Sequence, residues 1–125
     1  MKIEVSNGEL VDKVSILSIK LKKIKNQEKL KNIQKEYDLL FEDMKKLGVT
    51  EETEEYKKLI EVNTDLWEIE DRIRIKEANK EFDDEFIELA RSVYFQNDKR
   101  FELKTAVNKM TSSSIIEEKE YVKYK

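Results

Sequence analysis

The chain has 125 residues, of which 42% are charged and 38% apolar, and its formal net charge at pH 7 is −3. It contains neither cysteine nor histidine, which excludes disulfides, catalysis by thiolate or imidazole, and the usual zinc sites. The length fits a single domain, and the balance of charged and apolar residues is typical of long helices that each bury a narrow apolar stripe. Because the apolar residues recur at regular spacing, we expect an ordered chain.

Four helices are predicted in chain order, followed by a tail: residues 7–25, 27–47, 51–79, 83–109 and 110–125. The start of each helix has a residue whose side chain can accept a hydrogen bond from a free backbone amide: Ser6, Asn26 and Thr50 precede the first three helices, and the fourth begins at Asp83. Apolar residues then recur every three or four positions, which places them on one face. Gly48 follows the second helix at the position where a left-handed residue ends many helices. The sequence leaves open whether the tail docks or frays.

The join between the first two helices has two interpretations. The apolar spacing of threes and fours runs up to Ile24 and resumes at Leu30, and this six-residue step breaks the phase. A turn around Asn26 fits the step, and a stutter inside one continuous helix is the alternative. Short turns between long helices predict antiparallel neighbours. The predicted fold is therefore all-α, built of helical hairpins or a four-helix bundle with coiled-coil-like seams, and completed by a second copy in a homodimer.

No segment resembles a secretory signal or a membrane span, so we expect a cytoplasmic protein that does not enter a membrane. Two windows of opposite charge stand out. Residues 13–35 hold eight lysines and one acid, a net charge of +7, whereas residues 65–88 hold ten acids and four bases, a net charge of −6. The basic window has no arginine or aromatic residue, which disfavours nucleic acid as a partner. We expect the two windows to offset each other, within one chain or between partners.

Four acidic residues match the paired-carboxylate spacing of the all-helical nucleoside-triphosphate pyrophosphohydrolases, which hold magnesium between helices: Glu52, Glu55, Glu68 and Asp71. In that family the two pairs lie on successive helices, whereas here one helix is predicted over 51–79. At about 100° per residue, Glu52 and Glu68 lie about 160° apart around such a helix. The four could share a metal only if the helix broke near residues 63–65, so we predict neither a metal nor another cofactor.

The apolar face of the fourth predicted helix is interrupted by polar side chains, at Asn97, Arg100 and Lys104. A polar side chain on an apolar helix face must pair with another group of the protein or bind a ligand. One interpretation is a ligand site that takes an anion, with Arg100 as its bidentate anchor. The others are a buried asparagine that fixes the register of the helices, or a seam that has rotated out to solvent.

Three blocks of the sequence are familiar in combination: IEVSNGELVDK at residues 3–13, LWEIEDRIR at 66–74, and ARSVY at 90–94 with NDKR at 97–100. Together they resemble an uncharacterised family of small helical proteins from bacteria and their phages, a domain of unknown function. The resemblance covers nearly the whole chain. It implies that a common site would be sought among the polar residues and the tryptophan of these blocks: Glu9, Asp12, Lys13, Trp67, Glu70, Arg74, Asn97, Asp98 and Arg100.

Two functions are compatible with these patterns. The first is a non-enzymatic helical interaction or scaffold protein, which self-associates through its seams and presents charged faces to a protein partner. The alternative is a small-molecule-binding protein or enzyme that acts on a phosphorylated or sugar-nucleotide ligand. Its ligand-binding residues would be three cations for the anion, two carboxylates and an amide: Lys13, Arg100, Lys104, Glu70, Asp98 and Asn97. An open cleft at Asn97 and Arg100 would favour the alternative, and internal pairs would favour the scaffold.

Overall fold

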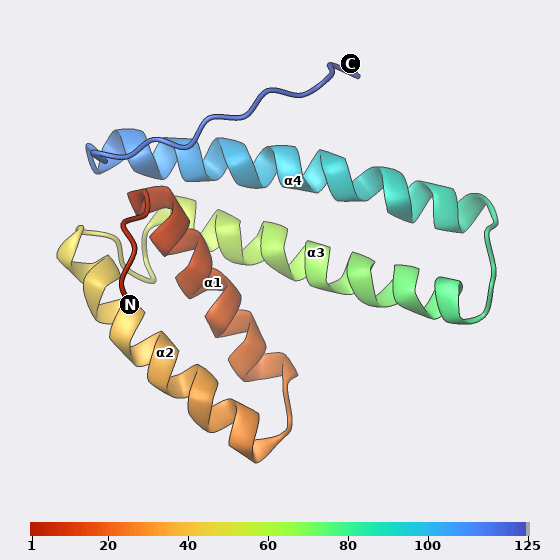
Figure 1. Cartoon of the computed structure of the whole chain (residues 1–125), viewed down its shortest axis with the longest axis horizontal. Coiled ribbons are helices and arrows are strands. Elements are labelled where there is room, and N and C mark those ends of the chain that lie inside the picture. Colours follow the sequence, from red (N-terminus) through yellow and green to blue (C-terminus); the bar gives the residue numbers. More distant parts are fainter. Residues whose placement is uncertain (125) are drawn as a thin grey trace.

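The computed structural model describes residues 1–124, which form four α-helices and no strand (Figure 1). The helices are α1 (Asn7–Lys23), α2 (Gln27–Lys46), α3 (Glu54–Ala78) and α4 (Asp84–Met110). The all-α prediction is confirmed. Within the described part of the chain, no helix combines the length and the apolar character that crossing a membrane requires.

Three of the helices begin where their N-caps predict. The side chains of Ser6, Asn26 and Asp83 each accept a hydrogen bond from a backbone N–H three residues on, at 3.0 to 3.1 Å. Residues 24–26 lie outside the helices, so the join between α1 and α2 is a turn and not a stutter. Gly48, which follows α2, has the left-handed conformation expected of a residue that ends a helix, with φ of 85°.

The start of α3 differs from the prediction. The backbone N–H of Thr50 donates to the Thr53 hydroxyl at 2.9 Å, and the N–H of Thr53 donates to the carbonyl of Thr50 at 3.0 Å. These two bonds close a turn that replaces the predicted first helical turn. As a result Thr53, and not Thr50, precedes the helix, which begins at Glu54.

Two antiparallel hairpins, α1–α2 and α3–α4, share one end of the molecule and diverge from it (Figure 1). Helix α1 packs against each of the other three helices, whereas the backbone of α2 comes close to that of α1 alone, and α2 meets α3 through side chains such as Tyr37 and Tyr56. The predicted helical hairpins are therefore present, and α1 joins them. The tail after α4 turns back and runs along that helix, so it docks (Figure 1).

The apolar core lies at the shared end of the hairpins. It is built from residues of all four helices and of the turn after α2: Val11, Val14, Met44, Val49, Tyr56, Leu59 and Val107. Leu17, which lies further along the α1 seam, is also fully buried. The middle of the apolar seam of α1 is thus covered within one chain, and Leu10, Leu21 and Ile24 are partly buried.

Gly8 marks the closest approach of α1 to α4. A Cβ atom added at this position would lie 2.3 Å from the carbonyl oxygen of Lys104, closer than any real contact. The backbone N–H of Gly8 donates to Oδ1 of Asn108 at 2.6 Å, which fixes the approach. Only glycine allows the two backbones to come so near each other.

Replacing Gly8 with alanine is expected to lower the free energy of unfolding by about 2 kcal/mol, the usual cost of adding a methyl group to a filled contact. Backbone atoms lie on both sides, so side-chain movement cannot relieve the clash. Denaturant unfolding followed by circular dichroism measures the change. Gly48→Asn is the control, because a Cβ at Gly48 meets nothing within 4 Å and asparagine tolerates the left-handed conformation. Equal losses in the two variants would contradict the assignment.

Candidate functional site

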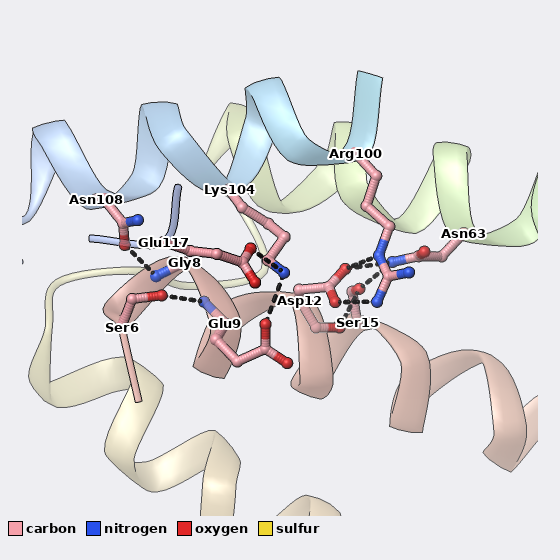
Figure 2. Close-up of polar contacts among 10 residues, drawn as sticks. All are labelled: Ser6, Gly8, Glu9, Asp12, Ser15, Asn63, Arg100, Lys104, Asn108 and Glu117. Atoms are coloured by element: carbon pink, nitrogen blue, oxygen red, sulfur yellow. Dashed lines mark hydrogen bonds and ion pairs between the residues drawn. The ribbon is translucent and has the colours of Figure 1, made fainter. Parts of the chain in front are cut away.

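Helices α1 and α4 meet through a row of polar contacts, which we call the polar seam (Figure 2). Along α4 its members are one turn apart, and each faces a residue of α1. The pairs are Asn108 with Gly8, Lys104 with Glu9, and Arg100 with Asp12. The polar interruption of the α4 stripe therefore has partners inside the chain at two of its three positions, Arg100 and Lys104.

Asp12 is the fully buried member of the polar seam. The guanidinium of Arg100 donates to both of its carboxylate oxygens, from Nε to Oδ1 at 3.0 Å and from Nη2 to Oδ2 at 2.6 Å. The amide of Asn63 in α3 donates to Oδ1 at 2.9 Å and to the hydroxyl of Ser15 at 2.8 Å. These bonds tie α1, α3 and α4 together at one point (Figure 2). The hydrogen bonds to Asp12 raise the pKa of Arg100 in spite of its burial.

Lys104 forms the second ion pair of the seam. Its Nζ lies 2.6 Å from a carboxylate oxygen of Glu9 and 3.0 Å from one of Glu117 in the tail. Burial lowers the pKa of this lysine, but the hydrogen bonds to Glu9 and Glu117 outweigh burial and the pKa is raised. Lys104 is therefore charged at neutral pH, and it holds the tail against α1 and α4 (Figure 2).

Two other predicted site residues lie apart from this row. Lys13 is half-exposed and lies 3.8 Å from Glu36 of α2. Asp98 accepts a hydrogen bond from the Tyr124 hydroxyl, which raises the pKa of that tyrosine to about 12. Lys13 and Asp98 thus contact α2 and the tail respectively, and the structure does not bring them together.

A cleft of about 570 Å³ opens between the second half of α1 and the middle of α3 and α4. This is within the range of small-molecule sites. Its apolar lining comes from all three helices: Ile16, Ile19, Leu66, Trp67 and Val93. Its polar lining comes from α3 and α4: Asn63, Glu70, Asp71, Arg74, Asn97 and Arg100. The cleft therefore gathers three of the predicted ligand-binding residues, Glu70, Asn97 and Arg100.

Several polar groups of the cleft have no partner within residues 1–124. The Asn97 amide, the Asp71 carboxylate and the indole N–H of Trp67 make no hydrogen bond or ion pair there. Arg100 uses Nε and Nη2 for Asp12, which leaves Nη1 unused, and 30% of its side chain is exposed. Glu70 lies 3.5 Å from Arg74, one turn along the same helix. The cleft thus presents donors and acceptors side by side.

The four carboxylates that match the pyrophosphohydrolase spacing do not come together in the structure. Helix α3 runs without a break through residues 63–65, so the break that would bring the two acidic pairs together is absent. Glu55 and Glu68 are separated by thirteen residues, about 20 Å along the helix axis. Glu52 lies before the helix, and only Asp71 lines the cleft. Within residues 1–124 no three carboxylates come near enough to one another to hold a metal ion.

Some members of the site were not predicted from the sequence. Asn63 and Asn108 are buried polar residues beside apolar seam positions, so a polar interruption like that of Arg100 marks them in the sequence too. Ser15 and Glu117 carry no such signal. Ser15 is a small residue inside α1, and Glu117 belongs to a tail that has no helical pattern.

Arg100→Met is expected to lower the free energy of unfolding by about 3 kcal/mol, because it leaves the Asp12 carboxylate buried without a cation. The double variant Asp12→Leu with Arg100→Met is expected to be more stable than Arg100→Met alone, since no charge is then stranded. A double-mutant cycle measured by denaturant unfolding gives the coupling, which we expect to exceed about 1 kcal/mol. The control is Arg72→Met, whose exposed pair with Glu85 is worth less than about 1 kcal/mol. Additive losses at Asp12 and Arg100 would refute the coupling.

The comparisons with known proteins identify a family but no activity. A family model described as a family of unknown function, DUF6165, matches residues 1–124. Searches of curated proteins and of solved structures find no match. The three sequence blocks that resemble such a family lie within the matched range, and in the fold they meet at the polar seam and the cleft. This chain belongs to the DUF6165 family of unknown function.

Proposed function

We propose that this protein is a non-catalytic binding protein whose cleft takes a small hydroxylated ring compound, such as a sugar. One observation carries the proposal: the unpartnered Asn97 amide and Asp71 carboxylate line the same cleft as Trp67. All three sequence blocks contribute to this place. The second and third line it, and the first supplies Asp12, which holds Arg100 at its edge.

The chemistry of the lining matches hydroxyl groups. A hydroxyl both donates and accepts hydrogen bonds, so it pairs well with a mixture of acceptors and donors. Asp71 accepts only, the free Nη1 of Arg100 donates only, and the Asn97 amide does both. The indole of Trp67 offers an apolar face on which the C–H face of a sugar ring can pack. The cleft thus offers an apolar surface for the sugar ring and hydrogen-bonding groups for its hydroxyls.

The cationic side chains of the predicted site are already paired with carboxylates, and this favours a neutral ligand over a phosphorylated one. Lys13, Arg100 and Lys104, the predicted anchors for an anion, each already lie within ion-pair distance of a carboxylate. Asp71, which also lines the cleft, forms no ion pair with a described residue and would repel an anion. A phosphate in the cleft would therefore compete with carboxylates for every cation, and we propose the sugar itself as the ligand rather than a sugar phosphate or sugar nucleotide.

The positions of the acids also favour binding over catalysis. Asp12 is held on both oxygens, and Asp98 accepts from the tail. Glu70 lies 3.5 Å from the guanidinium of Arg74 and is exposed. Asp71 lines the cleft without a partner but is exposed, so no carboxylate among these four is both free and sheltered in the cleft, as a general acid or base must be. A cytoplasmic location remains a prediction.

Self-association through the apolar seams, the other predicted function, has less support. On α1 the seam residues Val14 and Leu17 are fully buried by the chain itself, and Leu10, Leu21 and Ile24 are partly buried. A second copy therefore finds little of this seam exposed. A partner would have to use another surface.

Fluorescence of Trp67 tests the binding proposal directly, because it is the single tryptophan of the chain and lines the cleft. We expect neutral mono- and disaccharides to change its emission saturably and to raise the midpoint of thermal unfolding by several degrees. The titration should include the corresponding sugar phosphates and sugar nucleotides in separate series. Tighter binding of the phosphorylated series than of the neutral one would overturn the neutral-ligand proposal.

Asn97→Ala is expected to weaken binding about tenfold, the worth of one good hydrogen bond to the ligand. Thermal stability should be unchanged, because the Asn97 amide has no partner within residues 1–124. The matched control is Asn32→Ala, an exposed asparagine of α2 outside the cleft. Equal binding by Asn97→Ala and Asn32→Ala, or no response to any sugar, would refute the cleft as the binding site.

A further inference from the structure

The two hairpins end in arms of opposite charge, which diverge from the shared end and lie on either side of the cleft (Figure 1). The basic arm, residues 13–35, is the end of the α1–α2 hairpin and carries a net charge of +7. The acidic arm, residues 65–88, is the end of the α3–α4 hairpin and carries −6. Because the core joins the hairpins at their other ends, the fold keeps these charges apart.

Within residues 1–124 the two arms hardly offset each other. A single ion pair joins them, from Lys23 to Glu68 at 3.8 Å. One further lysine of the basic arm, Lys13, pairs with Glu36 at 3.8 Å, outside the acidic arm. The other lysines of the arm have no ion pair in the described chain: Lys20, Lys22, Lys25, Lys29, Lys31 and Lys35. The expectation that the windows neutralise each other inside one chain is thus met at one contact only.

We propose that the basic arm of one chain packs against the acidic arm of a second copy, and the reverse, in a two-fold dimer. In such a dimer one contact forms twice, because the same two surfaces meet at both ends. The net charge of −3 gives little overall repulsion between copies, while the separated charges attract in the antiparallel arrangement.

Apolar residues on the acidic arm suit the same partner. Ile75, Phe82 and Ile87 are 61%, 56% and 51% exposed, and they lie close to the acids at the end of the α3–α4 hairpin. Lysine side chains have long apolar stems that pack on such residues while the ammonium groups reach the surrounding carboxylates. The basic arm has lysines as its only cations, with no arginine and no aromatic residue, which favours this contact over nucleic acid.

Molar mass in solution at two salt concentrations tests the proposal. By light scattering we expect a dimer of the full chain at about 50 mM salt and a shift toward monomer at about 500 mM, where exposed charges are screened. A monomer at low salt would overturn the proposal, and so would a dimer that is unaffected by salt. Salt-sensitive binding of RNA or heparin by a monomeric protein would assign the basic arm to a polyanion instead.

Charge reversal identifies the arms. Lys25→Glu with Lys29→Glu lowers the basic arm from +7 to +3, and Glu77→Lys with Asp84→Lys changes the acidic arm from −6 to −2, so each variant should dimerise more weakly than the wild type at low salt. An equimolar mixture of the two variants should contain more dimer than either variant alone, because the mixed dimer keeps one unchanged contact, +7 against −6. Lys45→Glu with Lys46→Glu, at the other end of α2, is the matched control and should dimerise like the wild type. Undiminished dimerisation of both arm variants, or no recovery in the mixture, would refute the pairing of arms.

Discussion

The burial of one carboxylate, that of Asp12, fixes how the helices of this protein fit together. A buried charge is tolerated only where it is paired and hydrogen-bonded, so Arg100 and Asn63 must both reach Asp12 when the chain folds. They come from α4 and α3, and this requirement sets the position of α1 against the α3–α4 hairpin. Apolar packing alone tolerates shifts of register more readily than a bidentate ion pair does.

The same constraint explains why the molecule opens into arms. Helix α1 packs against all three other helices, whereas α2 comes close to α1 alone with its backbone and meets α3 through side chains in the core. The hairpins therefore share a core at one end only, and their other ends are free to carry charge. Separating +7 from −6 costs little when both arms are solvated, and it creates complementary surfaces in a chain whose net charge is only −3.

Local features of the fold were predictable from the sequence, and long-range pairings were not. Helix starts follow from side chains that bond to amides three residues away, as at Ser6, Asn26 and Asp83. Arg100 was identified as polar on an apolar stripe, but its partner Asp12 lies 88 residues away. Helical periodicity tells which face a residue occupies, not which helix covers that face. The cleft could not be predicted from the sequence for the same reason, since its position depends on where α1 stops covering α4.

The position of Asn97 connects the polar seam to the cleft. Along α4, Asn108, Lys104 and Arg100 each meet a group supplied by α1, and Asn97 continues the stripe by one more turn. There α1 presents Ile16 and Ile19, which cannot bond to an amide, and the cleft opens. Asn97 is thus a member of the stripe that α1 leaves without a polar partner. A ligand hydroxyl at this point would give Asn97 the polar partner that α1 gives to Asn108, Lys104 and Arg100. For this reason we assign ligand binding to this end of the stripe.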